Sequence, residues 1–380
     1  MNTSNSLNPS PFATIPDPRE ARKILYPLEN VLTITICAVM AGAEGWEEIE
    51  YFGHCKQAVL SQFLDLSAGI PKHDVYRRLL CRIDPVAFKS AFVEWARSRI
   101  GRRLINHIAI DGKTLRHSGV PSRDLKPLHM VSAWASEERL VLGQTTTEAK
   151  SNEITAIPDL LEHLPLNGAT VTIDAMGCQR AIAEQILARG GQYLFCLKGN
   201  QSSLHDDLRS YYLDARERGF TDMPHDALTK REKNRNRYET RTIRRLKDCA
   251  WLAQAHPGWP SLRSVYIMER IRRMPDDDDP HREVHYYISS LDPMTPLEDV
   301  MRLIRNHWHV ENSLHWTLDV VFREDECPIN DRWGAENLAT LRHLALSILK
   351  SDTTRKTSVK RKRKLVGWED QALIDFMAQI

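Results

Sequence analysis

Two aspartates each follow a short apolar run and precede a turn. Asp111 ends the segment "HIAID" and Asp174 ends the segment "VTID". A carboxylate at the carboxyl end of a buried strand stands on a rigid mount at the edge of a sheet, as a metal ligand requires. Mg²⁺ prefers oxygen ligands and keeps several waters, so a few carboxylates and a substrate phosphate can complete its shell. Each aspartate alone could equally be a turn or helix-cap residue.

A third acid is expected from a later helix. The stretch "RNHWHVENSLHW" (305–316) places Glu311 among three histidines and two tryptophans. Helical spacing predicts that Glu311 shares a face with His307, His315 and Leu318. A position inside a helix has no free backbone amide to cap, which favours a metal ligand over a cap.

Other acids compete for this role, and the histidines raise zinc as an alternative metal. "REDE" (323–326) has the character of a solvated turn. Zinc is disfavoured because the three histidines do not share one helical face and no cysteine assists them. The seven cysteines show no CxxC spacing, which favours reduced thiols in a cytoplasm. The competing acids are Asp319, Glu324, Asp325, Glu326 and Glu336.

The elements that must position these acids follow a recognisable order. From residue 104 the chain reads as three strands, a helix, a strand, a helix and a strand, ending in "QYLFCLKGNQ". Ser151 and Asn152 are expected to cap the first of these helices, with Glu153 in its first turn. This order predicts an α/β protein with a ribonuclease-H-like (RNase H-like) mixed-sheet core.

Residues from about 202 to 284 interrupt this core. Alternating segments such as "YETRTIRRL" and "SVYIMERI" predict a largely β insertion. The stretch 230–247 carries nine Lys/Arg against two Glu, and 355–364 carries seven Lys/Arg and no acid. Because the formal net charge is only +2, nucleic-acid binding must be argued from such clusters, and a solvated surface is the alternative.

An all-helical N-terminal domain is expected at 20–102, before a catalytic domain at 103–350. "HDVYRRLL", with Asp74 as a candidate cap, could read DNA, but an ordinary packing helix is the simpler reading. The apolar run at 31–43 is too short to span a bilayer and suits a core helix. Residues 1–19 read as a polar, Pro-rich tail without signal-peptide character, and 351–380 as a basic tail that is disordered when free.

Several motifs together resemble one known family. "IAIDGKTLRHS", "KSNEITAIPDLL", "VTIDAMGCQ", "LFCLKGNQ", "YYISSL" and "RNHWHVENSLHWTLDVVFREDE" look like bacterial insertion-sequence transposases of the H-repeat-associated type, within the DDE superfamily. The resemblance extends from about residue 20 to 350. It implies that Asp111, Asp174 and Glu311 form the metal-binding DDE triad.

The resemblance also implies a reaction and its partners. It predicts excision and strand transfer with two Mg²⁺ ions, or Mn²⁺ in their place. The expected partners are double-stranded DNA, in the form of terminal inverted repeats and target DNA, and a second copy of the chain. The expected location is the bacterial cytoplasm, in association with the nucleoid. Many related enzymes carry Tyr-x2-Arg-x3-Glu-x6-Lys, but Ile304, His307 and Leu318 occupy those positions here. The roles of the absent Tyr, Arg and Lys, which are phosphate contact and positioning of the cut DNA end, are assigned to Arg305, His307, His315 or Lys198.

DNA contacts are expected from the basic segments and from "KGNQ". The candidates are Arg241, Arg244 and Arg245 in the insertion, with Lys198, Asn200 and Gln201 after the last core strand. A simple Gly/Asn turn is the alternative for "KGNQ". Recognition of the element ends is assigned to the helical domain. The competing functions are an inactive or domesticated DNA-binding protein and a nuclease that only hydrolyses DNA.

Overall fold

The computed structural model describes residues 11–119, 125–147, 153–234, 237–274, 280–327 and 329–380. Its chain divides into two compact units. The first unit comprises 1–103, 112–152 and 310–380, and the second comprises 104–111 and 153–309. Ser151 and Asn152, the expected helix caps, and residues 1–10 of the expected tail lie outside the described residues.

The described strands form one nine-stranded mixed sheet. Its order is β3-β2-β1-β4-β5-β9-β8-β7-β6. The pairs β1–β4 and β4–β5 are parallel. The pairs β5–β9, β9–β8, β8–β7 and β7–β6 are antiparallel. The predicted core order is therefore present, and the predicted β insertion extends the same sheet through β9. The strands are β1 (His107–Leu115), β2 (Leu128–Ala135), β3 (Leu140–Thr147), β4 (Thr170–Ile173), β5 (Gln192–Leu197), β6 (His225–Asn234), β7 (Arg237–Leu246), β8 (Ser264–Arg273) and β9 (His281–Ser289).

The first unit is mainly helical. The core helix expected near residue 31 is present as α1, and α12 is buried along nearly its whole length although it carries polar residues such as Glu336, Asn337 and Arg342. Among the described residues, no single helix is long and apolar enough to cross a membrane, although α1 and α2, bent by 95°, pass by length and composition as a pair. Its helices are α1 (Leu28–Ala41), α2 (Trp46–Cys55), α3 (Gln57–Leu60), α4 (His73–Leu80), α5 (Pro85–Ile100), α11 (Trp316–Val321), α12 (Arg332–Ser351), α13 (Val359–Trp368) and α14 (Asp370–Met377).

Helix α4 carries the "HDVYRRLL" segment, and its predicted cap is wrong. The N-cap residue is Lys72, and Asp74 lies in the first turn. Asp74 instead pairs with Arg77 at 2.8 Å and Arg78 at 3.5 Å. Residues three and four apart are neighbours on a helix surface, so the carboxylate meets these guanidinium groups more readily than the helix terminus.

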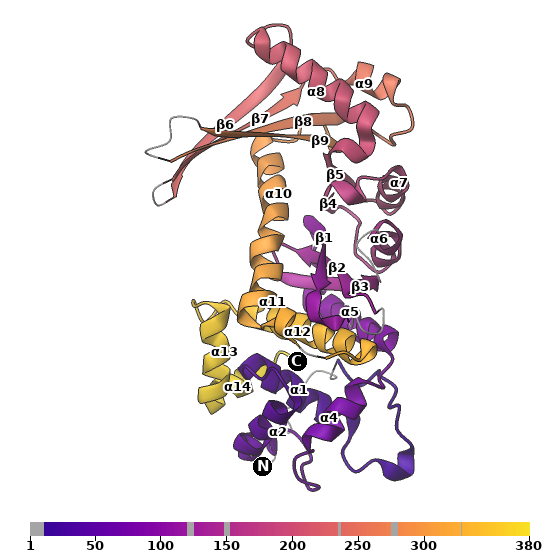
Figure 1. Ribbon diagram of the computed structural model, residues 1–380, viewed down its shortest axis with the longest axis vertical. Coiled ribbons are helices and arrows are strands. Elements are labelled where there is room, and N and C mark those ends of the chain that lie inside the picture. The colour runs from indigo at the N-terminus through magenta and orange to yellow at the C-terminus, as the bar shows by residue number, and fades with distance from the viewer. Residues whose placement is uncertain (1–10, 120–124, 148–152, 235–236, 275–279, 328) are drawn as a thin grey trace. The chain divides into compact units, whose positions relative to one another are not determined.

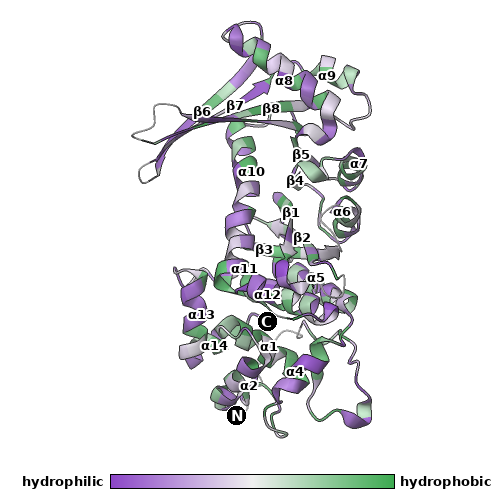
Figure 2. Ribbon diagram, viewed as in Figure 1, coloured by the Kyte–Doolittle hydropathy of each residue, from purple (hydrophilic) through white to green (hydrophobic). Residues whose placement is uncertain are grey.

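The C-terminal segment is folded, contrary to the expectation of a disordered tail. It forms α13 and α14, and α13 is largely hydrophilic (Figure 2). Lys362 is nevertheless buried, and its ammonium donates to the Leu349 carbonyl at 2.9 Å and pairs with Asp352 at 3.3 Å. Arg363 lies over the Phe322 ring and donates to the Val39 carbonyl at 2.9 Å. These cations are buried because they satisfy carbonyl groups at helix ends.

The N-terminal segment is also partly packed. Phe12 and Ile15 are buried, and the Phe12 ring lies 6.3 Å from the Phe88 ring. The expected tail therefore does not include residues 11–15, because two apolar side chains within five residues gain free energy by leaving water.

The second unit places helices on both faces of its strands. Helices α8 and α9 cover one face of β6 to β9, and α10 lies on the other (Figure 1). Apolar residues of α10, such as Val300 and Ile304, pack with Ile243, Tyr266 and Met268 of the strands. The helices are α6 (Glu153–Glu162), α7 (Arg180–Ala188), α8 (Ser202–Glu217), α9 (Ala250–Ala255) and α10 (Leu297–Val310).

Two buried histidines predict that acid destabilises the protein before its carboxylates titrate. Burial lowers the pKa of His343 in α12 to about 4 and that of His107 in β1 to about 3, from an ordinary value of 6.5. Between pH 6.5 and about 4 the unfolded chain binds protons that the folded chain does not. The free energy of unfolding should therefore fall as the pH drops through this window, by about 3 kcal/mol for His343.

Urea unfolding at pH 7 and pH 4.5 measures this effect. A His343→Gln variant should show a smaller loss between the two pH values, whereas the exposed control His54→Gln should match the unmodified protein. Equal losses in all three proteins would contradict the assignment.

Candidate active site

The structure brings Asp111 and Asp174 side by side. Ile110 pairs with Ile173 in the parallel ladder of β1 and β4, and each aspartate is the next residue of its chain. Both are half-buried. Parallel strands end at the same edge of a sheet, so the two carboxylates stand on adjacent rigid mounts.

Asp111 does not end its strand, which corrects the prediction. β1 continues to Leu115, where the apolar run has already stopped. On its other edge β1 neighbours β2, and the Thr114 hydroxyl lies 3.0 Å from Nδ1 of His129. The ladder to β4 ends at Ile110, so Asp111 marks the point where the strand leaves one neighbour while keeping the other.

The turn after β4 is built around Asp174. Its Oδ1 accepts hydrogen bonds from the amides of Met176 at 3.0 Å and Gly177 at 3.4 Å. A Cβ at Gly177 would lie 2.2 Å from Cγ2 of Ile173, so only glycine fits this tight turn. Asp174 thus acts as a cap through one carboxylate oxygen, and Oδ2 is not used in the turn.

The "KGNQ" loop supports the same turn. The Asn200 side-chain amide donates to the Ala175 carbonyl at 2.5 Å, and that of Gln201 donates to the Cys178 carbonyl at 2.9 Å. Lys198 is exposed beside them. Asn200 and Gln201, predicted as DNA contacts, therefore have a structural task that the sequence did not reveal.

Glu311 lies inside a continuous helical run, as predicted, but at a π-helical turn. The turn spans Glu311–His315 between α10 and α11. Glu311 is exposed and His315 is buried, so the two side chains have different surroundings although they lie four residues apart on one helical run. The extra residue of a π turn rotates the following helix, and such turns are frequent at functional sites.

The five competing acids are all held in ion pairs. Asp319, Glu324 and Asp325 surround the Lys113 ammonium at 2.5, 2.7 and 3.3 Å. Glu326 pairs with Arg323, and Glu336 pairs with Lys89 at 2.7 Å. Glu311 forms no ion pair with any residue that the structure describes. The "REDE" segment is not a simple solvated turn, because Glu324 is 3% exposed.

The charges in the Lys113 cluster respond differently to burial. Burial raises the pKa of Asp319, and Lys113 offsets this only in part. Complete burial also disfavours the charged form of Glu324, yet Lys113 and the nearby cations hold its pKa below the ordinary value. Glu324 is therefore the carboxylate that depends most on Lys113.

The candidates for phosphate contact occupy different surroundings. His307 is half-buried, and its Nδ1 lies 3.0 Å from the Thr172 hydroxyl. Arg305 binds Glu232 of β6 at 2.7 Å, and its hydrogen bond holds the pKa of Glu232 below the usual value. His315 belongs to the first unit and is 6% exposed, which does not suit a direct DNA contact.

Strand alternation separates the three predicted arginines of β7. Arg241 and Arg245 share one face, and Arg244 lies on the other. Arg244 stacks over the Phe220 ring at 4.2 Å and pairs with Glu269 at 3.2 Å. Arg245 pairs with Asp226 at 2.7 Å.

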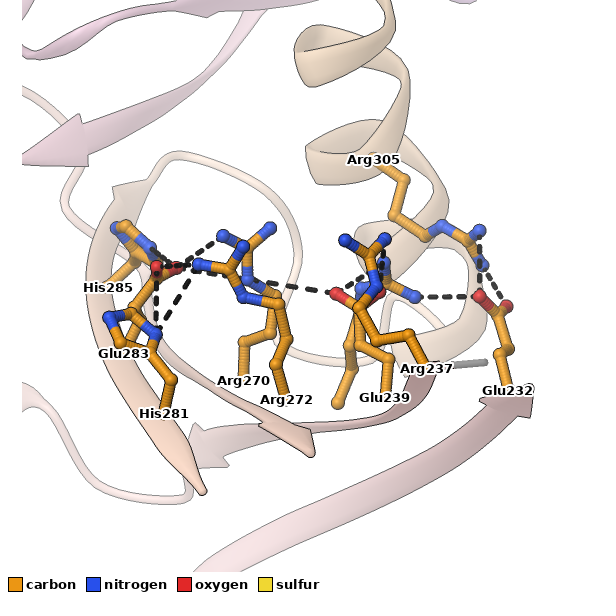
Figure 3. A network of polar contacts seen from close by, with 10 residues as sticks. Glu232, Arg237, Glu239, Arg270, Arg272, His281, Glu283, His285 and Arg305 are labelled. Carbon is orange, nitrogen blue, oxygen red and sulfur yellow. Dashed lines mark hydrogen bonds and ion pairs between the residues drawn. The ribbon is translucent and has the colours of Figure 1, made fainter. Parts of the chain in front are cut away.

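A network of ion pairs links strands β6 to β9 with Arg305 of α10 (Figure 3). Arg241 belongs to this network because it binds Glu232 and Glu239 at 2.7 Å each. Five arginines outnumber three glutamates in this network, so the network is positive and its guanidinium groups are held in place. The members are Glu232, Arg237, Glu239, Arg241, Arg270, Arg272, His281, Glu283, His285 and Arg305.

The donor set fits a hard divalent cation. Adjacent aspartate carboxylates supply oxygen ligands of the type that Mg²⁺ prefers. Within the described ranges, no group of three or more His, Cys, Asp or Glu residues is placed to hold a metal ion. Asp111 and Asp174 belong to the second unit and Glu311 to the first. The paired aspartates are thus the part of the predicted triad that the fold brings together.

A mixed sheet with aspartates leaving adjacent parallel strands is the architecture of RNase H-like proteins that act on nucleic-acid phosphates. The family model described as "Transposase DDE domain" matches residues 102–348, and the model described as "DDE_Tnp_1-associated" matches residues 10–96. The chain belongs to the DDE transposase family. This confirms the resemblance and the predicted α/β, RNase H-like fold.

Named relatives agree with this assignment. The chain is 39% identical to the H repeat-associated putative transposase YhhI of Escherichia coli K12, over 97% of this chain and 96% of the relative. It is 38% identical to the putative transposase YncI of E. coli O157:H7, over 94% and 90%. A 65-residue stretch is 48% identical to the inactive transposase YbfQ of E. coli K12, covering 17% of this chain and 77% of that one.

Proposed function

We propose that this chain is a DNA transposase that cuts DNA at the ends of an insertion sequence and joins the freed 3′-hydroxyl to target DNA. The observation that carries the proposal is the pairing of Ile110 with Ile173, which sets Asp111 beside Asp174 in a chain of the DDE transposase family. Glu311 is the third acid, because its rivals are engaged in ion pairs. Cleavage by the Glu311→Gln variant, described in the Discussion, tests the proposal.

The three acids would hold two Mg²⁺ ions. When bound, these ions would activate a water or the 3′-hydroxyl of the DNA and would stabilise the leaving oxygen. Asp174 keeps its carboxylate oriented by the amides of its own turn. Asn200 and Gln201 hold that turn through its backbone carbonyl groups. No side chain needs to form a covalent intermediate in this reaction.

DNA would contact Lys198 and the arginine network. Lys198 is an exposed cation on the loop that supports the Asp174 turn. The network glutamates fix the arginines before DNA arrives, which lowers the entropic cost of binding a phosphate backbone. Arg305 belongs to α10, the helix that continues into Glu311.

Replacing Lys198 with alanine should weaken DNA binding uniformly across sequences. Loss of one phosphate contact should reduce the slope of log K against log salt by about one. Fluorescence anisotropy over a salt series measures the slope. Arg218→Ala is the control, because Arg218 is exposed in the same unit and already pairs with Asp214 and Asp222. Equal slopes for Lys198→Ala and the unmodified protein would remove Lys198 from the interface.

The remaining partners are also proposals. The helical segment 20–102 would recognise the terminal inverted repeats. Joining two element ends would require at least two copies of the chain. The reaction would take place in the bacterial cytoplasm. A nuclease with the same core would cut the ends without joining them, so strand-transfer products with a supercoiled target distinguish the two. An inactive DNA-binding protein would bind the ends and give neither product.

A further inference from the structure

A threonine hydroxyl lies between two histidines at the centre of the second unit. The Thr172 Oγ1 is 2.8 Å from Nε2 of His107 and 3.0 Å from Nδ1 of His307. Thr172 is 3% exposed and His107 is 1% exposed. The three residues come from β4, β1 and α10, so the chain of hydrogen bonds links the two strands of the aspartates to the helix that leads to Glu311.

The protonation of His107 follows from its surroundings. Burial lowers its pKa to about 3, so the imidazole is neutral near pH 7 and carries one N–H. Its Nδ1 is buried and has no hydrogen-bond partner among the residues that the structure describes. A buried N–H without an acceptor is rarer in proteins than a buried acceptor without a donor. The proton therefore resides on Nε2, the nitrogen that faces Thr172.

This proton gives the hydrogen bonds a direction. Nε2–H of His107 donates to the Thr172 oxygen, and the Thr172 hydroxyl donates its own proton to Nδ1 of His307. Nδ1 of His307 must then be unprotonated. A neutral His307 consequently carries its proton on Nε2, the ring nitrogen turned away from Thr172.

We propose that His107 and Thr172 are positioning residues that fix His307 as an Nε2–H donor for a DNA phosphate oxygen beside the paired aspartates. The inference rests on the proposed function and deepens it. His307 lies four residues before Glu311 on one helical run, and Thr172 lies two residues before Asp174. A donor held here by a buried hydroxyl keeps both its ring orientation and its tautomer when DNA binds.

The test is ¹⁵N NMR of histidine-labelled full-length protein, in which the two tautomers of a neutral imidazole have different ring-nitrogen shifts. A His307→Gln variant identifies the His307 signals. The unmodified protein should show the Nε2–H form at His307. Thr172→Ser keeps the hydroxyl and should preserve that form, whereas Thr172→Val removes it and should produce a mixture. Cleavage of element-end DNA should fall about 10- to 100-fold in Thr172→Val and recover in Thr172→Ser.

The His107→Phe variant and the tautomer measurement distinguish a failure of the inference from misfolding of Thr172→Val and from a failure of the proposed function. His107→Phe leaves the hydroxyl free to rotate and should give a partial mixture at His307, even if Thr172→Val fails to fold. An unchanged Nε2–H form in Thr172→Val or His107→Phe, or an Nδ1–H form in the unmodified protein, overturns the inference. If the unmodified protein does not cleave DNA, the proposed function fails. The tautomer measurement still decides whether His107 and Thr172 fix the tautomer of His307.

Discussion

Replacing Asp174 with asparagine is expected to reduce cleavage of element-end DNA by at least about 10³-fold, which corresponds to about 4 kcal/mol of lost transition-state stabilisation. Asparagine can still accept the amides of Met176 and Gly177 through its carbonyl oxygen, so the turn should persist. The negative charge that would hold a divalent cation is lost. The measurement is single-turnover cleavage of labelled DNA with saturating Mg²⁺.

The matched control is Asp159→Asn, which removes an exposed aspartate from α6 in the same unit. It should cleave like the unmodified protein, and both variants should retain DNA affinity. Asp111→Asn should resemble Asp174→Asn, because the two carboxylates occupy equivalent positions on paired strands. Cleavage by Asp174→Asn within a few-fold of the control would exclude that carboxylate from the reaction.

Replacing Lys113 with methionine is expected to destabilise the first unit by about 3–5 kcal/mol, because it leaves Glu324 buried without its cation. The Lys113 side chain is 10% exposed and that of Glu324 is 1% exposed. Methionine has a similar length, so the packing of the stem should change little. Urea unfolding at pH 7 measures the loss.

A second substitution identifies the cause. The double variant Lys113→Met, Glu324→Gln should recover part of the stability, because it removes the uncompensated charge. Lys23→Met, at an exposed pair with Glu20, should change stability by less than about 1 kcal/mol. A loss in Lys113→Met no larger than in Lys23→Met would show that the cluster does not stabilise the fold.

The strands and the paired aspartates could be predicted from the sequence because a short apolar run of strand length depends only on neighbouring residues. "HIAID" and "VTID" each show where burial stops, and the order of elements leaves few topologies for the sheet. The exact end of β1 could not be predicted, because residues 112–115 remain in the sheet through a neighbour on the other edge. That support depends on how β2, the next strand along the chain, is placed beside β1.

The π turn at Glu311 has no local sequence signal. Helical spacing predicts an ordinary helix through Glu311, and only the structure shows the π turn, with Glu311 exposed and His315 buried. Likewise, hydropathy indicates that Glu324, Lys362 and Arg363 are solvated. Each is buried because a specific partner in the folded chain compensates its charge or accepts its hydrogen bonds. Such pairings depend on three-dimensional placement and not on composition.

We propose that Glu311 acts with Asp111 and Asp174 in metal-assisted cleavage. The experiment compares cleavage of labelled element-end DNA by the unmodified protein, Glu311→Gln and the exposed control Glu326→Gln, with DNA affinity measured for each. We predict that Glu311→Gln binds DNA normally and does not cleave it, while Glu326→Gln cleaves like the unmodified protein. Equal cleavage by Glu311→Gln would place the third ligand elsewhere, and binding without cleavage by all three proteins would contradict a catalytic function.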